Sequence, residues 1–87
     1  MAKILVFHYT EEGRVPKLSE QELKDLRAKF DEVLKGYPGV HFSTYVDDNG
    51  MGVCIWEAPN IEVVKEIEEK VIGAPPADPV IVVKQIL

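Results

Sequence analysis

The sequence predicts an α+β fold in which two helices cover one face of a four-stranded antiparallel sheet. Four runs of β-forming residues are separated by two amphipathic stretches that carry helix-capping residues. Their order along the chain is strand, helix, strand, strand, helix, strand. The chain has 87 residues, which is enough for one domain, residues 1–87, and no more.

The first part of the chain predicts one strand and one helix. Residues 3–9 (KILVFHY) are rich in β-formers and predict the strand, and residues 10–18 predict a loop. Ser19 can cap the helix that follows, because Glu22 stands three residues later and completes a capping box. Gly36 ends the helical pattern.

A predicted hairpin comes next. Residues 40–46 (VHFSTYV) and 51–57 (MGVCIWE) predict strands, and residues 47–50 (DDNG) predict the turn that joins them. A turn over all four of these residues places Ser43 opposite Cys54. This pairing decides which side chains share a face of the sheet.

A second helix and a last strand complete the pattern. Asn60 is a suitable N-cap, Gly73 ends the helix, and residues 79–87 (PVIVVKQIL) predict the strand. The order βαββαβ is that of the ferredoxin-like arrangement. We therefore expect the strand order 4-1-3-2, with both helices on one face.

Both faces of the predicted sheet are apolar. In the first strand Ile4 and Val6 alternate with Leu5 and Phe7, and the last strand repeats this pattern. Because the helices cover one face only, the other face needs a cover. A second copy packed across a twofold axis provides it, so we expect a homodimer of the dimeric α+β barrel type. The alternative is a monomer with an apolar open sheet.

The expected pairing also sorts the side chains between the two faces. Val53 and Ile55 are the natural helix-facing residues of the third strand. His8 joins the opposite, open face if Leu5 and Phe7 point toward the helices. The expected residues of that open face are His41, Ser43, Tyr45, Cys54 and Trp56.

Three residues are of the types that bind a transition metal. His8, His41 and Cys54 offer imidazole nitrogen and thiolate sulfur, which suit nickel, zinc or copper, although no CxxC or HxxxH spacing is present. The two histidines should lie about 15 Å apart at opposite ends of one sheet, so a shared site would need the dimer. The alternative is isolated polar residues at the rim of a pocket or interface.

Other reactive groups favour structural roles. Cys54 has no base beside it in the expected pairing, which favours an inert core residue over a nucleophile. Glu57 and Asp78 can act as acid and base. Anchoring of a loop by Glu57, and side-chain to backbone hydrogen bonds from Asp78, are the simpler roles.

Composition and charge exclude several classes of partner. The chain has 15 acidic and 10 basic residues, a net charge of −5, and no basic cluster, which disfavours nucleic acid. No apolar run reaches the roughly 18 residues that span a bilayer, so we expect no membrane segment. The single cysteine and the lack of a signal peptide predict a cytoplasmic protein.

Two motifs resemble a known family. Residues 50–60 (GMGVCIWEAPN) and 72–83 (IGAPPADPVIVV) are similar to a family of small, mostly uncharacterised ferredoxin-like proteins that includes a nickel-binding member. The resemblance implies a homodimer that binds nickel or another transition metal near the dimer interface. It makes His8, His41 and Cys54 the candidate metal ligands.

One region departs from the metal-binding members of that family. They resemble one another in having histidines in the second helix and in the loop after it. Here residues 67–78 (IEEKVIGAPPAD) contain none. Glu68 and Glu69 supply only oxygen, which holds nickel less well than imidazole does.

Two other functions stay open. Dimeric α+β barrels include cofactor-independent monooxygenases and isomerases, in which an ordered side chain acts as a base; His8, His41 and Tyr45 are the candidates here. The other possibility is a module that binds a small apolar ligand without chemistry. Trp56 and Tyr45 can stack on such a ligand, although packing across the dimer is their simpler role.

Overall fold

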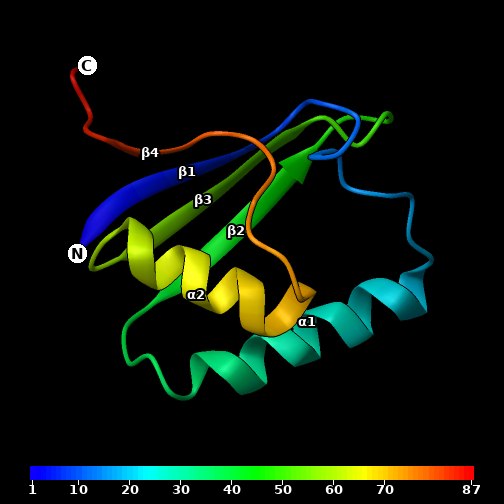
Figure 1. Ribbon diagram of the computed structural model, residues 1–87, viewed down its shortest axis with the longest axis horizontal. Helices are drawn as coiled ribbons and strands as arrows, with labels where there is room; N and C mark the ends of the chain where they lie inside the picture. The colour runs from blue at the N-terminus through cyan, green and yellow to red at the C-terminus, as the bar shows by residue number, and fades with distance from the viewer.

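The computed structural model describes residues 1–87, the whole chain. It confirms the α+β, ferredoxin-like fold and the predicted βαββαβ order. Figure 1 shows the two helices side by side along one face of the sheet. The elements are β1 (Ala2–His8), α1 (Glu20–Leu34), β2 (His41–Val46), β3 (Gly52–Ala58), α2 (Ile61–Ile72) and β4 (Val80–Val83).

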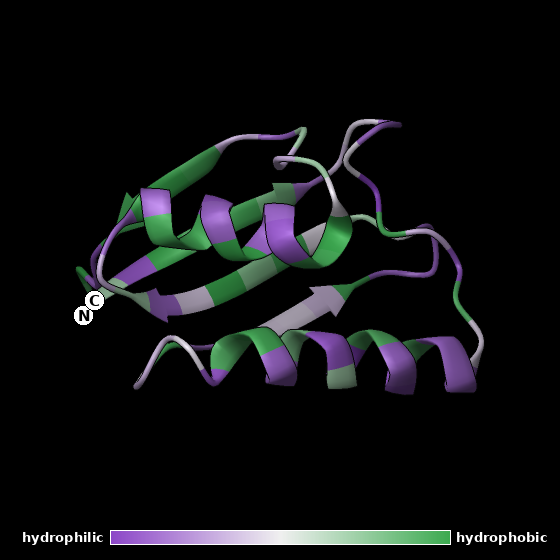
Figure 2. Cartoon of the chain, turned by 60° about the horizontal axis from the view of Figure 1, so that its bottom comes forward, coloured by the Kyte–Doolittle hydropathy of each residue, from purple (hydrophilic) through white to green (hydrophobic).

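The sheet has the strand order that the sequence predicts. The order is β2-β3-β1-β4, and every neighbouring pair is antiparallel. Since β1 and β2 both flank β3, they run parallel to each other. Both helices lie on the same side of the sheet in Figures 1 and 2, which leaves the other face open. Neither helix is long and apolar enough to cross a membrane.

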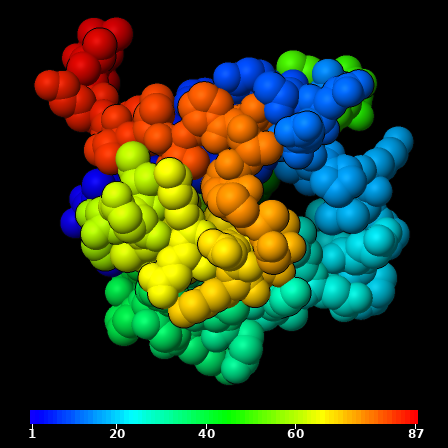
Figure 3. Space-filling model, in the orientation of Figure 1, coloured from blue at the N-terminus to red at the C-terminus, as the bar shows by residue number.

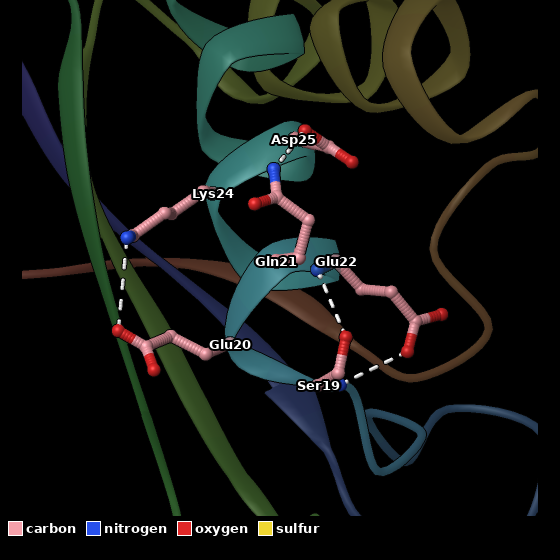
Figure 4. A network of polar contacts seen from close by, with 6 residues as sticks. All are labelled: Ser19, Glu20, Gln21, Glu22, Lys24 and Asp25. Carbon is pink, nitrogen blue, oxygen red and sulfur yellow. Dashed lines mark hydrogen bonds and ion pairs between the residues drawn. The ribbon is translucent and has the colours of Figure 1, made fainter.

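The start of α1 confirms the predicted capping box. The Glu22 N–H donates to Ser19 Oγ at 3.1 Å, and the Ser19 N–H donates to Glu22 Oε1 at 3.0 Å (Figure 4). These bonds satisfy two donors at a helix end that would otherwise lack a partner. The exposed pair of Lys24 and Glu20, 3.6 Å apart, adds little to stability.

The ends of α2 are also as predicted. Asn60 Oδ1 accepts the Val63 N–H at 2.9 Å, and Gly73 closes the helix with a left-handed φ of 88°. Between these caps, the helix buries an apolar stripe that includes Ile67 and Val71. The stripe packs against the sheet and holds the helix on it.

β4 is shorter than the sequence predicts. The strand spans Val80–Val83 rather than 79–87. Lys3 pairs with Val83, and β1 begins at Ala2, so the chain beyond Val83 runs out of partner residues. The C-terminal residues project from the body of the molecule in Figures 1 and 3.

The hairpin between β2 and β3 differs from the predicted one by a single residue. The Asp47 N–H donates to the Met51 carbonyl at 2.8 Å, so the loop has three residues, 48–50, rather than four. Gly50 has a φ of 76°, the left-handed conformation that closes such a loop. The Val15 N–H also donates to the Gly50 carbonyl at 2.9 Å, which ties the hairpin to the loop after β1.

This difference reverses the face that each β3 residue occupies. Thr44 lies opposite Cys54, so the predicted pairing of Ser43 with Cys54 is wrong. Cys54 and Trp56, expected on the open face, point toward the helices and are 5% and 0% exposed. The residues of β2 keep their predicted faces.

His8 also lies on the helix-covered side of the sheet. Ile4 and Val6, which share its parity along β1, are fully buried under the helices. Leu5 and Phe7 point the other way. The condition that would have placed His8 on the open face is therefore not met.

Trp56 is at the centre of the core. Its ring stacks on Phe42 with centroids 4.4 Å apart, and Phe30 of α1 meets it edge-on at 6.2 Å. Trp56 has no exposed surface, and its indole N–H has no hydrogen-bond partner. The prediction that this ring is available to a ligand on the open face is therefore wrong.

The open face is apolar along its middle and charged at one end. Lys3 and Glu57 form an ion pair of 3.8 Å there. Val53 and Ile55, expected under the helices, face this side instead. The apolar residues of the open face, taken from the strand pairing, are Leu5, Phe7, Tyr45, Val53, Ile55, Ile81 and Val83.

Replacing Gly50 by Ala should destabilise the fold more than the same change at Gly73. Both glycines have positive φ, which costs an alanine about 1 to 2 kcal/mol. An added Cβ at Gly50 would also overlap the Val15 carbonyl, whereas nothing lies within 4 Å at Gly73. We expect Gly50→Ala to lose about 1 to 3 kcal/mol more than Gly73→Ala in urea denaturation. Equal losses would contradict the hairpin geometry.

Candidate functional site

His8 ends β1 and faces Cys54 of β3. Its Nδ1 lies 2.8 Å from the Gly13 carbonyl oxygen, and its Nε2 lies 3.0 Å from Cys54 Sγ. A carbonyl oxygen only accepts hydrogen bonds, so Nδ1 carries a proton. In the neutral ring Nε2 then holds the lone pair and accepts the Cys54 S–H. The expectation that Cys54 has no base beside it is therefore wrong.

Cys54 has a second partner in Thr44. The Thr44 Oγ1 lies 2.9 Å from Sγ, and because the thiol proton points at His8, this hydroxyl donates to the sulfur. Burial raises the pKa of the Cys54 thiol to about 11; the Thr44 hydrogen bond opposes this, and the charge of Glu68 adds to it. Cys54 is thus a neutral thiol at pH 7.

The loop after β1 is built around Asp78. Its carboxylate accepts the Tyr9 N–H at 2.7 Å, the Thr10 N–H at 3.1 Å and the Thr10 hydroxyl at 2.7 Å. Burial alone would raise the pKa of Asp78, but these bonds outweigh it and hold that pKa below its usual value. A Cβ at Gly13 would overlap this carboxylate, which its hydrogen bonds hold in place, so glycine suits the position from which the loop aims its carbonyl at His8. The expected side-chain to backbone bonds of Asp78 are present, although they order the loop after β1 rather than the connector that precedes β4.

A cleft of about 720 Å³ opens beside the His8–Cys54 pair. It lies between the helix-covered side of the sheet, the two helices, and the loops that follow β1 and α2. Clefts of this kind, with apolar walls and a few converging polar groups, are the usual form of small-molecule sites. The polar groups are His8, Thr44, Cys54 and Glu68, and the apolar walls include Leu26, Phe30, Phe42, Ile72 and Pro75.

Glu68 is the buried acidic group of this cleft; Glu12, which also lines it, is exposed. Glu68 lies on α2 and is only 7% exposed, yet its carboxyl forms no hydrogen bond or ion pair within the chain. Burial raises the pKa of this carboxyl from 4.5 to about 7. The Glu68 oxygens are not enclosed in the core, since the Trp56 indole nitrogen is the one enclosed side-chain polar atom without a partner; they reach the cleft instead.

The structure brings together two of the three predicted metal ligands. His8 and Cys54 are in contact, but His41 is exposed on the open face at the other end of the sheet, opposite Glu57. No group of three His, Cys, Asp or Glu side chains is placed to hold a metal ion. Of the three candidate bases for an oxygenase or isomerase, only His8 lines the cleft, since Tyr45 is also on the open face.

Sequence reasoning missed Thr44 at the site, and it considered Glu68 only as a weak nickel ligand. Thr44 follows directly from the correct hairpin pairing with Cys54. Glu68 carries a signal that was available: it stands among the buried positions of α2, four residues after Val64 and three before Val71. A charged residue at such a position predicts a buried polar group that faces either a partner or a cavity.

Comparison with known proteins assigns the chain to a family. Residues 5–83 match the family described as nickel responsive protein SCO4226-like. The chain belongs to this family. The matched stretch includes His8, His41 and Cys54, and the match bears out the resemblance to a nickel-related family. No curated protein and no solved structure matches the chain.

The buried Glu68 predicts a pH-dependent stability. The folded state holds the Glu68 proton up to about pH 7, whereas the unfolded chain releases it near pH 4.5. The contribution of Glu68 to the free energy of unfolding is thus fully present below about pH 4.5 and is lost as the pH rises to 7 and beyond. The total change is about 3 kcal/mol. Denaturation of Glu68→Gln across this range should show a flatter profile. Parallel curves for the variant and the wild type would refute the assignment.

Proposed function

We propose that this protein binds nickel, or a closely similar transition metal, through His8 Nε2 and Cys54 Sγ. The observation that carries the proposal is the contact of 3.0 Å between these two atoms at the edge of the cleft. Membership of a nickel-responsive family supports nickel as the metal. The single free cysteine also supports our assignment to the cytoplasm, where thiols stay reduced.

The surroundings of the pair fit metal binding. Imidazole nitrogen and thiolate sulfur are donors that nickel accepts readily. The Gly13 carbonyl fixes the His8 ring so that the unprotonated Nε2 faces Cys54, and Thr44 donates to the sulfur. Both metal-binding atoms therefore belong to side chains with hydrogen-bond partners of the kind that tune metal ligands. A bound cation would act as a Lewis acid and stabilise the thiolate in place of the thiol.

The chain itself provides an incomplete set of ligands. No third His, Cys, Asp or Glu side chain joins the pair, and the histidines expected in metal-binding relatives are absent from residues 67–78. The remaining positions on the metal fall to water or to a small molecule in the cleft. We therefore expect an exchangeable metal, with affinity below that of a site with three or four protein ligands.

Nickel titration of the metal-free protein tests this proposal. By calorimetry at pH 7.5 we expect one Ni²⁺ per chain, with release of the Cys54 proton because the pKa of the free thiol is about 11. The release is measured by repeating the titration in buffers of different ionisation enthalpy. His8→Ala and Cys54→Ser should each weaken binding about tenfold or more.

His41→Ala is the matched control, since it removes an exposed imidazole on the other face of the sheet. It should leave the affinity for Ni²⁺ unchanged. Stronger dependence on His41 than on His8 would contradict the assignment of the ligands. Absence of any saturable Ni²⁺ binding would contradict the function itself.

We further propose that two copies of the chain pack through their open faces. Only 13 of the 87 residues are buried in one copy, which is a small core for a stable domain. A second copy would cover the apolar strip of the open face, and a twofold axis makes that strip its own partner. The proposed metal site then lies inside each protomer, under the helices, and only His41 is near the interface.

Neighbouring residues of β4 provide the test. Ile81 is 40% exposed on the open face, and Val82 is 56% exposed on the opposite side of the same strand. In sedimentation experiments at micromolar concentration we expect a dimer for the wild type and for Val82→Lys. Ile81→Lys should shift the protein to monomers, because a buried lysine would lack a partner in the interface. A wild-type monomer would rule the dimer out.

A further inference from the structure

No side chain of the protein pairs with the carboxyl of Glu68, although two lysines lie nearby in α2. Lys70, two residues away, is already engaged with Glu66 at 3.4 Å and with the Tyr37 hydroxyl at 2.7 Å. Lys65 is exposed and does not pair with Glu68. Because Glu68 is nearly buried and its oxygens are accessible from the cleft, a donor for this carboxyl is expected from that side.

Neither of the two arginines that line the cleft pairs with Glu68. Arg27 pairs with Asp31 at 3.1 Å and lies over the Phe42 ring at 4.8 Å. Arg14 is exposed, and its Nε donates to the Tyr9 carbonyl. The unpaired ionisable group inside the cleft is therefore the acidic Glu68. The exposed margin of the cleft carries both acidic and basic side chains.

The walls of the cleft favour an apolar group. Phe30 and Phe42 both line it, with ring centroids 4.6 Å apart, and Leu26 and Ile72 add aliphatic surface. Trp56 stacks on the Phe42 ring and Arg27 lies over it, so this wall offers apolar contact rather than a free ring face. The cleft thus combines an aromatic wall with a single buried acceptor.

We infer that this cleft binds a small organic amine, with an apolar body against the wall that includes Phe30 and Phe42 and a protonated amino group donating to Glu68. An ammonium group offers up to three N–H donors and a positive charge, which together satisfy the carboxylate. The inference rests on Glu68 and the cleft, and it holds whether or not a metal binds at His8 and Cys54.

The test uses 2-phenylethylamine as the probe, with 2-phenylethanol and 3-phenylpropionate as neutral and anionic probes of similar size. Metal-free protein labelled with ¹⁵N is titrated at pH 7.5, and amide shifts are followed by NMR. We expect saturable shifts centred on Glu68 and the cleft loops. We expect the amine to bind at least about fivefold more tightly than the alcohol, and the carboxylate most weakly.

Two neighbouring substitutions separate a specific site from a general attraction to acidic protein. Glu68→Gln keeps the shape of the side chain and should remove the preference for the amine, leaving the alcohol's affinity within about twofold. Glu69→Gln removes an exposed carboxylate next in sequence and should change nothing. The proposal is overturned if Glu68→Gln retains the amine preference, if the alcohol or the carboxylate binds best, or if no probe saturates.

Discussion

The loop between β2 and β3 is the constraint on which the rest of the structure depends. With three residues between Asp47 and Met51, the loop sends Cys54 and Trp56 toward the helices. Trp56 then fills the core against Phe42, and Cys54 comes within reach of His8. One more residue in the loop would exchange the two faces of β3 and remove both features.

A second group of contacts turns this neighbourhood into a site. Asp78 fixes the loop after β1, the loop presents the Gly13 carbonyl, and that carbonyl fixes the ring of His8. The result is an imidazole nitrogen with a free lone pair beside a thiol, at the edge of a cleft that also contains Glu68. The steps are linked hydrogen bonds, and Asp78 and Cys54 each have more than one partner, which makes the arrangement rigid.

Local signals in the sequence were enough for the fold but not for the site. The caps at Ser19 and Asn60 and the order of the elements predict both helices and the strand order, because these depend on neighbouring residues. The motif DDNG is compatible with a loop of three or four residues. One contact that favours the three-residue loop joins Gly50 to Val15, 35 positions away in the chain. A pattern of neighbouring residues cannot reveal such a contact.

The central claim is that His8 presents an unprotonated Nε2 to Cys54. The position of the proton on the imidazole ring tests this claim most directly. Long-range ¹H–¹⁵N correlation NMR of the metal-free protein, at a pH where the ring is neutral, distinguishes the two ring nitrogens. The account predicts the proton on Nδ1, bonded to the Gly13 carbonyl, and none on Nε2. A proton found on Nε2 would contradict the account, since that nitrogen could then neither accept the thiol proton nor bind a metal.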